Sequence, residues 1–475
     1  MKKLYTLALM ALAVVSLQAK VYTLADLAAI EGSGVTFVDG DYIVNVDAAL
    51  TEDVVLDDGG ITVNKTDLII NEGNSLKIQD GERLFFGNKA RITVNGDISA
   101  IGITSNILIS ATDDAVGSAL GFRVYYDEAS VAFKAVEIKY VGISFGSANG
   151  SLTIENCYFD SHNGKLSNNA VNFTASSKGN VVKNTTFYGC YGGCIATGAT
   201  NPVGINISGC IFEGNGTSKR LLPAINICCG GDNDIYIEDN EIYGTGQETR
   251  AGGIALGNLL GVTVNNTCYV RRNLVKSNSY GITLTGAGKV YIEDNQIIDN
   301  YLIQGGNPNS GGSGINITNS NGTSWAFIKG NYIEGNFWGI TNIGANEVNC
   351  GKTEDPNAED YNPGLNVFVN NGNGDAEFAK CDLANNGTAT LYAQGNTWSV
   401  DEQTEEQIET CIYHKNDNDA LGVVIFMPPF DPNVGVTDIK VNAPADGVYY
   451  NLLGQPVANP SNGIYIINGK KVLVK

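Results

Sequence analysis

Charged residues recur in pairs at one position of a short repeated pattern in the middle of the chain. Each pair directly follows an aliphatic residue, and the pairs are Glu238-Asp239, Arg271-Arg272 and Glu293-Asp294. Carboxylate oxygens are the ligands that Ca²⁺ prefers, and a guanidinium can stabilise negative charge that develops in a reaction. The same alternation of sign is also typical of an ion-pair ladder between neighbouring strands, which has a small net effect on stability.

An aromatic residue stands one place before the same aliphatic residue in four successive copies of the pattern. These residues are Tyr236, Tyr269, Tyr291 and Phe327. In a strand they would point outward and form a stripe. One interpretation is a ladder that stabilises stacked strands by about 0.2–1 kcal/mol per pair. The other is a ligand-binding platform, because the apolar face of a sugar ring suits an aromatic plane.

The aliphatic residues anchor a repeat that recurs at irregular steps of 22 to 36 residues. The anchors are Ile154, Val182, Ile207, Ile237, Val270, Ile292 and Ile328. An apolar residue lies five places after each anchor, and a second series pairs a small residue with an apolar one, as in Gly281-Ile282. Each repeat therefore holds two or three short strands, too few for a propeller blade, and this favours an all-β parallel β-helix solenoid.

Asparagine stands three places after four of the anchors, at Asn240, Asn273, Asn295 and Asn331. A sharp corner requires a residue that tolerates the left-handed conformation, and an asparagine amide can also bond the amide of the next coil. We therefore expect a structural ladder here rather than a ligand site.

Composition excludes some partners. The net charge is −21, so nucleic acid and anionic membranes are not expected to bind. Residues 1–19 combine two lysines with an apolar run, as in a secretory signal peptide, and no later run is long enough for a transmembrane helix. The ten cysteines leave one or two disulfides open, Cys350 with Cys381 among them, whereas zinc is not expected with only two histidines.

Two stretches resemble secreted right-handed parallel β-helix proteins of the pectate-lyase-like kind. LIINEGNSLKIQDGERLFFGNKARITVNGDISAIG resembles their opening coils, and NTWSVDEQTEEQIETCIYHKNDNDALGVVIFMPPF resembles their closing segment, with a helix expected over 407–413. The resemblance implies a right-handed solenoid of roughly ten to twelve coils. The expected organisation is a cap with first coils over 20–112, the main β-helix with its closing helix over 113–432, and a small β-rich domain over 433–475.

The same resemblance implies a possible activity, because such β-helices include calcium-dependent polysaccharide lyases. In that case Glu238, Asp239, Glu293 and Asp294 would hold Ca²⁺, and Arg271 and Arg272 would assist proton abstraction. The acids that flank each arginine keep it protonated, which makes it a poor base.

The last segment, GVYYNLLGQPVANPSNGIYIINGKKVLVK, resembles the C-terminal sorting domain of surface proteins exported by the type IX route in Bacteroidetes. This implies the export machinery as a partner. We therefore expect a secreted or outer-membrane-surface protein that binds polysaccharide or a cell-surface glycan without catalysis and without a cofactor. The alternative is a calcium-dependent lyase or another enzyme that degrades acidic polysaccharide.

Overall fold

The computed structural model describes residues 20–56, 67–113, 119–160, 169–218, 222–244, 252–301, 312–319, 321–372 and 381–431, with 449–450, 456–457, 463–467 and 470–474 of the tail. The expected signal peptide lies outside these residues. The chain divides into two compact units, Met1–Pro429 and Phe430–Lys475.

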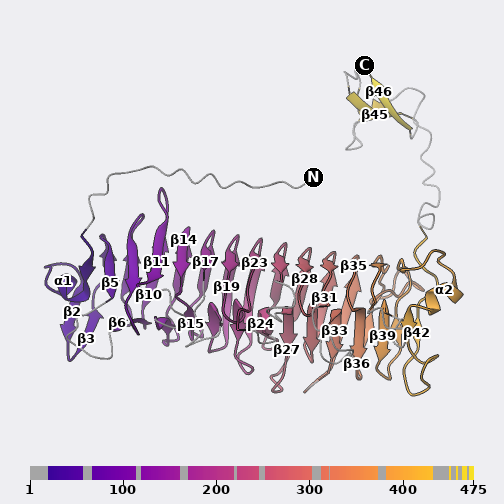
Figure 1. Cartoon of the computed structure of the whole chain (residues 1–475), viewed down its shortest axis with the longest axis horizontal. Coiled ribbons are helices and arrows are strands. Elements are labelled where there is room, and N and C mark those ends of the chain that lie inside the picture. Colours follow the sequence, from indigo (N-terminus) through magenta and orange to yellow (C-terminus); the bar gives the residue numbers. More distant parts are fainter. Residues whose placement is uncertain are drawn as a thin grey trace. The chain divides into compact units, whose positions relative to one another are not determined.

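Three long parallel sheets form the first unit, because the chain passes from one sheet to the next and returns to the first after each coil (Figure 1). Among the described residues, sheets A, B and C hold 13, 15 and 14 strands. All their strand pairs are parallel except for β2 with β3. The prediction of an all-β parallel β-helix is confirmed. With 13 to 15 described strands in each sheet, the solenoid is longer than the roughly ten to twelve coils expected.

Sheet A contains β1 (Tyr22–Thr23), β5 (Val54–Leu56), β8 (Arg83–Phe86), β11 (Ile107–Ala111), β14 (Val136–Lys139), β17 (Tyr158–Asp160), β20 (Thr186–Tyr188), β23 (Ile211–Glu213), β26 (Glu241–Tyr243), β29 (Leu274–Lys276), β32 (Gln296–Ile298), β35 (Tyr332–Glu334) and β38 (Val367–Val369). Sheet B contains β2 (Val35–Val38), β3 (Asp41–Val44), β6 (Asp67–Ile70), β9 (Arg91–Val94), β12 (Gly121–Val124), β15 (Ile143–Phe145), β18 (Val171–Phe173), β21 (Ile195–Thr197), β24 (Pro223–Cys228), β27 (Gly252–Gly257), β30 (Ile282–Thr285), β33 (Ser313–Thr318), β36 (Trp338–Ile343), β39 (Leu383–Asn386) and β41 (Ile412–Tyr413). Sheet C contains β4 (Ala48–Leu50), β7 (Ser75–Ile78), β10 (Asp97–Ile101), β13 (Val131–Lys134), β16 (Leu152–Glu155), β19 (Ser177–Lys183), β22 (Val203–Ser208), β25 (Ile235–Glu238), β28 (Thr267–Arg271), β31 (Gly288–Glu293), β34 (Ser324–Lys329), β37 (Glu347–Asn349), β40 (Leu391–Tyr392) and β42 (Val424–Ile425).

The second unit contains a four-stranded antiparallel sheet. Its order is β44 (Pro456–Val457), β43 (Tyr449–Tyr450), β45 (Gly463–Ile467) and β46 (Lys470–Val474). This confirms the expected small β-rich C-terminal domain.

Both ends of the solenoid carry a short helix, which covers apolar residues that an open coil would expose. Helix α1 (Leu24–Ala28) starts with a capping box between Thr23 and Asp26 and buries Leu24 and Leu27. Helix α2 (Glu405–Glu409) is capped by Thr404 and buries Ile408. The expected helix at 407–413 therefore begins and ends earlier, because the chain enters β41 at Ile412.

The core consists of columns of inward side chains, since like positions of successive coils lie in register. All seven anchors of the repeat are fully buried. Five residues further on, Phe159, Phe187 and Phe212 stack with ring centroids 4.9 and 5.0 Å apart. The column continues through Ile242, Val275, Ile297 and Ile333, also fully buried. The predicted periodicity therefore sets which residues form the core.

The predicted asparagine ladder exists and is almost entirely buried. The Nδ2 group of each member donates to the Oδ1 atom of the next at 2.9 Å, from Asn240 through Asn273, Asn295, Asn331 and Asn366 to Asn396. The reason given for asparagine at this position was wrong in one respect: the left-handed residue is the one before it, for example Asp239 with φ 58°. A second ladder that the sequence pattern did not predict joins Asn278, Asn300, Asn336 and Asn371.

All ten cysteines are buried thiols. The disulfides left open by the sequence, Cys350 with Cys381 among them, are not formed. Cys157 and Cys210 fill inward positions, and burial raises their pKa to about 11 and about 12. The Sγ atoms of Cys229 and Cys268, from neighbouring coils, lie 3.5 Å apart.

Candidate functional site

The predicted site residues lie at one corner of the solenoid, where each coil passes from sheet C to sheet A. One residue per coil there adopts the left-handed conformation, and the next side chain points inward. The left-handed residues are Asn156, Asn184, Gly209, Asp239, Arg272, Asp294 and Gly330, with φ between 49° and 69°. Because every coil repeats this turn, outward side chains at equivalent positions form columns along the solenoid.

The four predicted ligand-binding residues form one such column, named here the aromatic column. Tyr236, Tyr269, Tyr291 and Phe327 are register partners on β25, β28, β31 and β34, and all are half-buried. The Tyr236 and Tyr269 rings stack at 5.1 Å and 9°, and those of Tyr269 and Tyr291 at 5.4 Å and 10°. Trp325, which the sequence pattern did not single out, meets Tyr291 edge-on at 5.5 Å.

This stacking decides which part of each ring can reach a ligand. Both faces of Tyr269 are covered by neighbouring tyrosines, and the Arg271 guanidinium lies 4.2 Å from its centroid. The stacked pairs support the stabilising role expected for an aromatic ladder. A ligand would meet ring edges and hydroxyl groups along the column rather than open ring faces.

The predicted charged residues form a second column beside the first, named here the charged column. Glu238, Arg271, Glu293 and Lys329 are register partners, and the corner residues Asp239 and Arg272 adjoin them. Arg271 Nε donates to Glu293 Oε2 at 2.7 Å. Arg272 donates from Nε and Nη2 to the two oxygens of Asp239 at 2.7 and 2.9 Å. The alternation of charge thus produces the ion-pair ladder that was one of the two interpretations of the sequence pattern.

These pairs bear on the chemistry available at the corner. The hydrogen bonds that Arg272 donates to Asp239, together with the nearby carboxylates, raise the pKa of Arg272, which keeps this side chain a cation. The carboxylates of Glu238, Asp239 and Glu293 already face arginine groups. Within the described ranges, no three or more histidine, cysteine or acidic side chains gather as a metal ion would require.

Replacing Arg272 with Ala should lower the free energy of unfolding by less than about 1 kcal/mol at neutral pH, because both partners of its bidentate pair are about half exposed and screened by water. The Arg272 hydrogen bond holds the pKa of Asp239 below its ordinary value. The pair therefore stabilises the fold at pH values above about 3.9, the pKa of an aspartate in the unfolded chain. This contribution is lost as the pH falls through the lower pKa of Asp239 in the folded protein. The coupling energy between Arg272 and Asp239 is measured by a double-mutant cycle. Denaturation is followed at pH 7 and in acid for the wild type, Arg272→Ala, Asp239→Ala and the double variant. A coupling that persists in strong acid would contradict this account.

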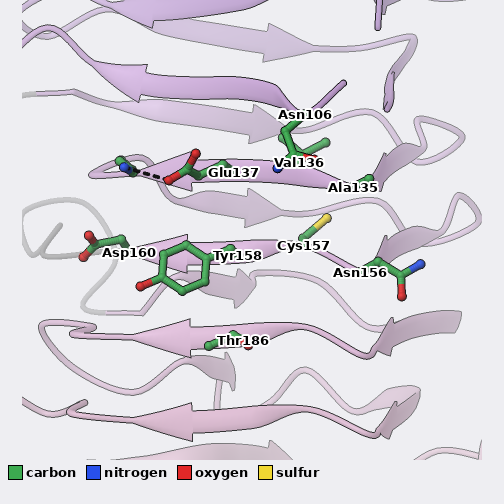
Figure 2. A pocket seen from close by; sticks show the side chains of 10 residues that line it. Asn106, Ala135, Val136, Glu137, Asn156, Cys157, Tyr158, Asp160 and Thr186 are labelled. Carbon is green, nitrogen blue, oxygen red and sulfur yellow. Dashed lines mark ion pairs between the residues drawn. The ribbon is translucent and has the colours of Figure 1, made fainter. Parts of the chain in front are cut away.

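A cavity of about 510 Å³ opens on the outer face of sheet A, near the same corner but several coils earlier. Its lining comes from β14, β17 and β20 and the turns before them, and includes Glu137, Lys139, Tyr158, Asp160 and Thr186 (Figure 2). Lys139 Nζ and Glu137 Oε1 form an ion pair at 2.7 Å, and the hydrogen bond to Glu137 raises the pKa of Lys139. Tyr158 is 38% exposed, and partial burial together with Asp160 raises the pKa of its hydroxyl.

Sequence reasoning missed this cavity. Each sheet A strand there is about three residues long, with its first and last side chains outward and its middle one in the core. Tyr158 and Asp160 flank the buried Phe159 in this way, so the apolar residue five places after each anchor marks the strand. The residues directly before and after this apolar residue point outward, and their positions in the repeat could have been used to predict the lining of the cavity.

Three parallel sheets wound into one solenoid, with buried asparagine ladders at a corner, define a parallel β-helix protein. No protein-family model and no curated protein matches the chain. Among solved structures it is similar to the periplasmic alginate epimerase AlgG, at 12% identity and a TM-score of 0.31, covering 86% of this chain and 83% of that one. A double mutant of that epimerase gives 14% identity and a TM-score of 0.30, covering 86% and 84%. In the described part of the chain, no helix is both long and apolar enough to span a membrane.

Proposed function

We propose that this protein is an exported β-helix protein that recognises or adheres to polysaccharide at the cell surface or outside the cell, without catalysing a reaction. The observation that supports this most is the aromatic column, in which four outward aromatic side chains repeat in register from coil to coil. A linear glycan also repeats its groups at a fixed step. A ladder of like side chains can therefore offer each sugar unit an equivalent set of contacts.

The stacked rings supply a rigid row of hydroxyl groups. Tyr236, Tyr269 and Tyr291 are held nearly parallel by one another, so little side-chain freedom remains to be lost when a ligand binds. Each hydroxyl can donate and accept a hydrogen bond, as sugar hydroxyls do. The contribution of the column to binding therefore lies in its ring edges and hydroxyls.

The absence of catalysis is proposed because the groups suited to it are engaged with one another. Arg271 and Arg272 are held in ion pairs of 2.7 Å with acids of adjacent coils. A cationic arginine cannot accept the proton that a lyase or an epimerase must remove. Releasing either guanidinium from its ion pair would also leave the negative charge of its carboxylate partner unbalanced.

Changing Tyr236, Tyr269 and Tyr291 to Phe in one variant should weaken polysaccharide binding by at least about tenfold. The three hydroxyl groups that are lost each contribute about 0.5–1.5 kcal/mol through hydrogen bonds, whereas the stacked rings remain. The measurement is affinity on a glycan array and by calorimetry on the polysaccharides found. The matched control changes three tyrosines away from the column, Tyr22, Tyr125 and Tyr413, to Phe. Equal affinity of wild type and the column variant would show that the column does not bind the glycan.

The second candidate is a calcium-dependent lyase acting on acidic polysaccharide, which the closeness of Arg271 and Arg272 to Glu238 and Asp239 favours. In this candidate Glu238, Asp239, Glu293 and Asp294 hold Ca²⁺, and the two arginines assist proton abstraction. Lyase products absorb ultraviolet light because they contain an unsaturated uronate. No rise in absorbance with any uronate polymer, with or without calcium, would remove this candidate.

The proposed location is the cell surface or the medium, with residues 1–19 acting as a signal peptide and the C-terminal unit, which resembles a type IX sorting domain, engaging the export machinery. The four-stranded antiparallel sheet of that unit supports a folded recognition module. Cell fractionation of chains with and without residues 433–475 provides the test. An unchanged distribution would show that the tail is not a sorting signal.

A further inference from the structure

We propose that the cavity on the outer face of sheet A binds a neutral, hydroxyl-rich stretch of polysaccharide, made of uncharged pyranose units rather than uronates. This inference rests on the proposed function, since it names the ligand class and adds a binding site away from the aromatic column. Cavity shape, the environment of Tyr158 and the placement of charge each support it independently.

The cavity has the size and lining of a small-ligand site. Its volume of about 510 Å³ falls within the roughly 300–1,000 Å³ typical of such sites. The floor is apolar, since Val136 and Cys157 are 1% and 4% exposed, whereas the rim carries polar and charged side chains. An apolar floor with a few polar groups above it suits a sugar ring, which has apolar faces and a polar edge.

Tyr158 provides an aromatic surface that the aromatic column lacks. Its register partners on the adjacent strands of sheet A are Glu137 and Thr186, so neither residue paired with it is aromatic. Tyr188, on the next strand and 43% exposed, is likewise flanked in register by Asp160 and Glu213. Ring surface is thus open on this face of the solenoid, whereas Tyr269 is covered on both sides.

The charges at the cavity favour a neutral ligand. Glu137 and Asp160 are carboxylates, and Lys139, the one cation among the described residues that line the cavity, is bonded to Glu137 at 2.7 Å. A uronate would have to lie beside Asp160 and separate Lys139 from Glu137. Sugar hydroxyls instead donate to carboxylates in charge-assisted hydrogen bonds, which are stronger than neutral ones.

The charge of the whole chain acts in the same direction. The net charge is −21, so a polyanion approaching the solenoid is repelled before any contact forms. An uncharged polysaccharide has no such barrier. Its binding should therefore depend little on salt, whereas any binding of a polyanion should strengthen as salt screens the repulsion.

The test compares neutral polymers, namely a β-glucan, a mannan and a galactan, with the polyuronates alginate and polygalacturonate, each at low and high salt and with and without calcium. The protein is the full exported chain, and the variants are Tyr158→Ala and Asp160→Asn. The control is Tyr332→Ala, which removes a half-buried outward tyrosine of the same sheet far from the cavity. Circular dichroism and thermal melting establish that each variant is folded.

We expect wild type to bind at least one neutral polymer, Tyr158→Ala to weaken that binding by about tenfold, Asp160→Asn to weaken it by a smaller factor, and Tyr332→Ala to leave it unchanged. Preference for a polyuronate would overturn the ligand class. Neutral binding that Tyr158→Ala leaves intact, or that Tyr332→Ala weakens equally, would overturn the location. No binding to any polymer would instead count against the proposed function itself.

Discussion

Replacing Asn295 with Ala is expected to lower the free energy of unfolding by about 3 kcal/mol, because it interrupts the buried asparagine ladder at its centre. Asn295 is 1% exposed. Its Nδ2 group donates to Asn331 Oδ1 and to the Val270 carbonyl, each at 2.9 Å. Its Oδ1 atom accepts from the backbone and side-chain amides of Asn273, also at 2.9 Å. Alanine leaves all four partner groups buried without this residue's amide.

The cost exceeds that of one hydrogen bond, because the groups left behind remain out of water. A buried donor or acceptor without a partner costs about 1–3 kcal/mol, whereas a satisfied bond contributes only about 1 kcal/mol net. The small cavity left by the amide adds to this loss. Aspartate at the same place would keep two acceptor oxygens but lose both donors, so we expect it to be at least as destabilising.

The measurement for Asn295→Ala combines denaturant unfolding with hydrogen exchange of the backbone between residues 292 and 297, because repeat arrays can unfold in parts. Asn206→Ala is the control, since Asn206 is an exposed residue of β22 one coil before the start of the aromatic column. The control should change stability by no more than about 0.5 kcal/mol. Equal effects of the two substitutions would contradict a structural ladder.

Replacing Gly281 with Val is expected to cost about 3 kcal/mol, because the coils approach each other too closely there for a side chain. A Cβ atom on Gly281 would lie 2.3 Å from the Gly314 carbonyl oxygen and 2.9 Å from Ile297 Cγ2. The first neighbour is backbone, so it cannot move aside as a flexible side chain would. The position belongs to the predicted series of small residues, in which Gly253, Gly314 and Gly339 have similarly close backbone neighbours.

Thr283→Val, in β30 and two residues after Gly281, is the matched control. Thr283 is half-buried and points outward in β30, so this nearly isosteric change should cost less than about 1 kcal/mol. Gly281→Ala should have an intermediate effect, because Ala170 and Ala224 occupy the corresponding place in earlier coils. The denaturant midpoints of Gly281→Val, Gly281→Ala and Thr283→Val give the order of their stabilities. A valine variant as stable as the control would show that the coils can separate locally at little cost.

Much of the fold could be predicted from local pattern alone, because every coil repeats the same environment. The anchors, the apolar residues five places later and the asparagines of the first ladder all lie where the repeat places them. In a parallel β-helix one residue pattern determines which side chains face the core, and stacking then brings equivalent residues into contact. The outward columns at Tyr269 and Arg271 follow from the same register.

Other features depend on contacts that no single repeat contains. The left-handed conformation falls on Asp239 rather than Asn240, because the inward amide requires the preceding residue to make the turn. The cysteines remain thiols because coil packing, and not sequence spacing, determines which sulfur atoms approach one another.

The class of fold, the inward side chains and the residues that share a column can all be predicted from the amino-acid pattern, since they depend on periodicity. What each outward column presents to solvent depends instead on how the coils pack. The rings of Tyr236, Tyr269 and Tyr291 cover one another, whereas the register partners of Tyr158 on the adjacent sheet A strands, Glu137 and Thr186, are not aromatic. Exposure of an outward side chain depends on its register neighbours in the adjacent coils, and their identity is a property of the stacked coils rather than of one repeat.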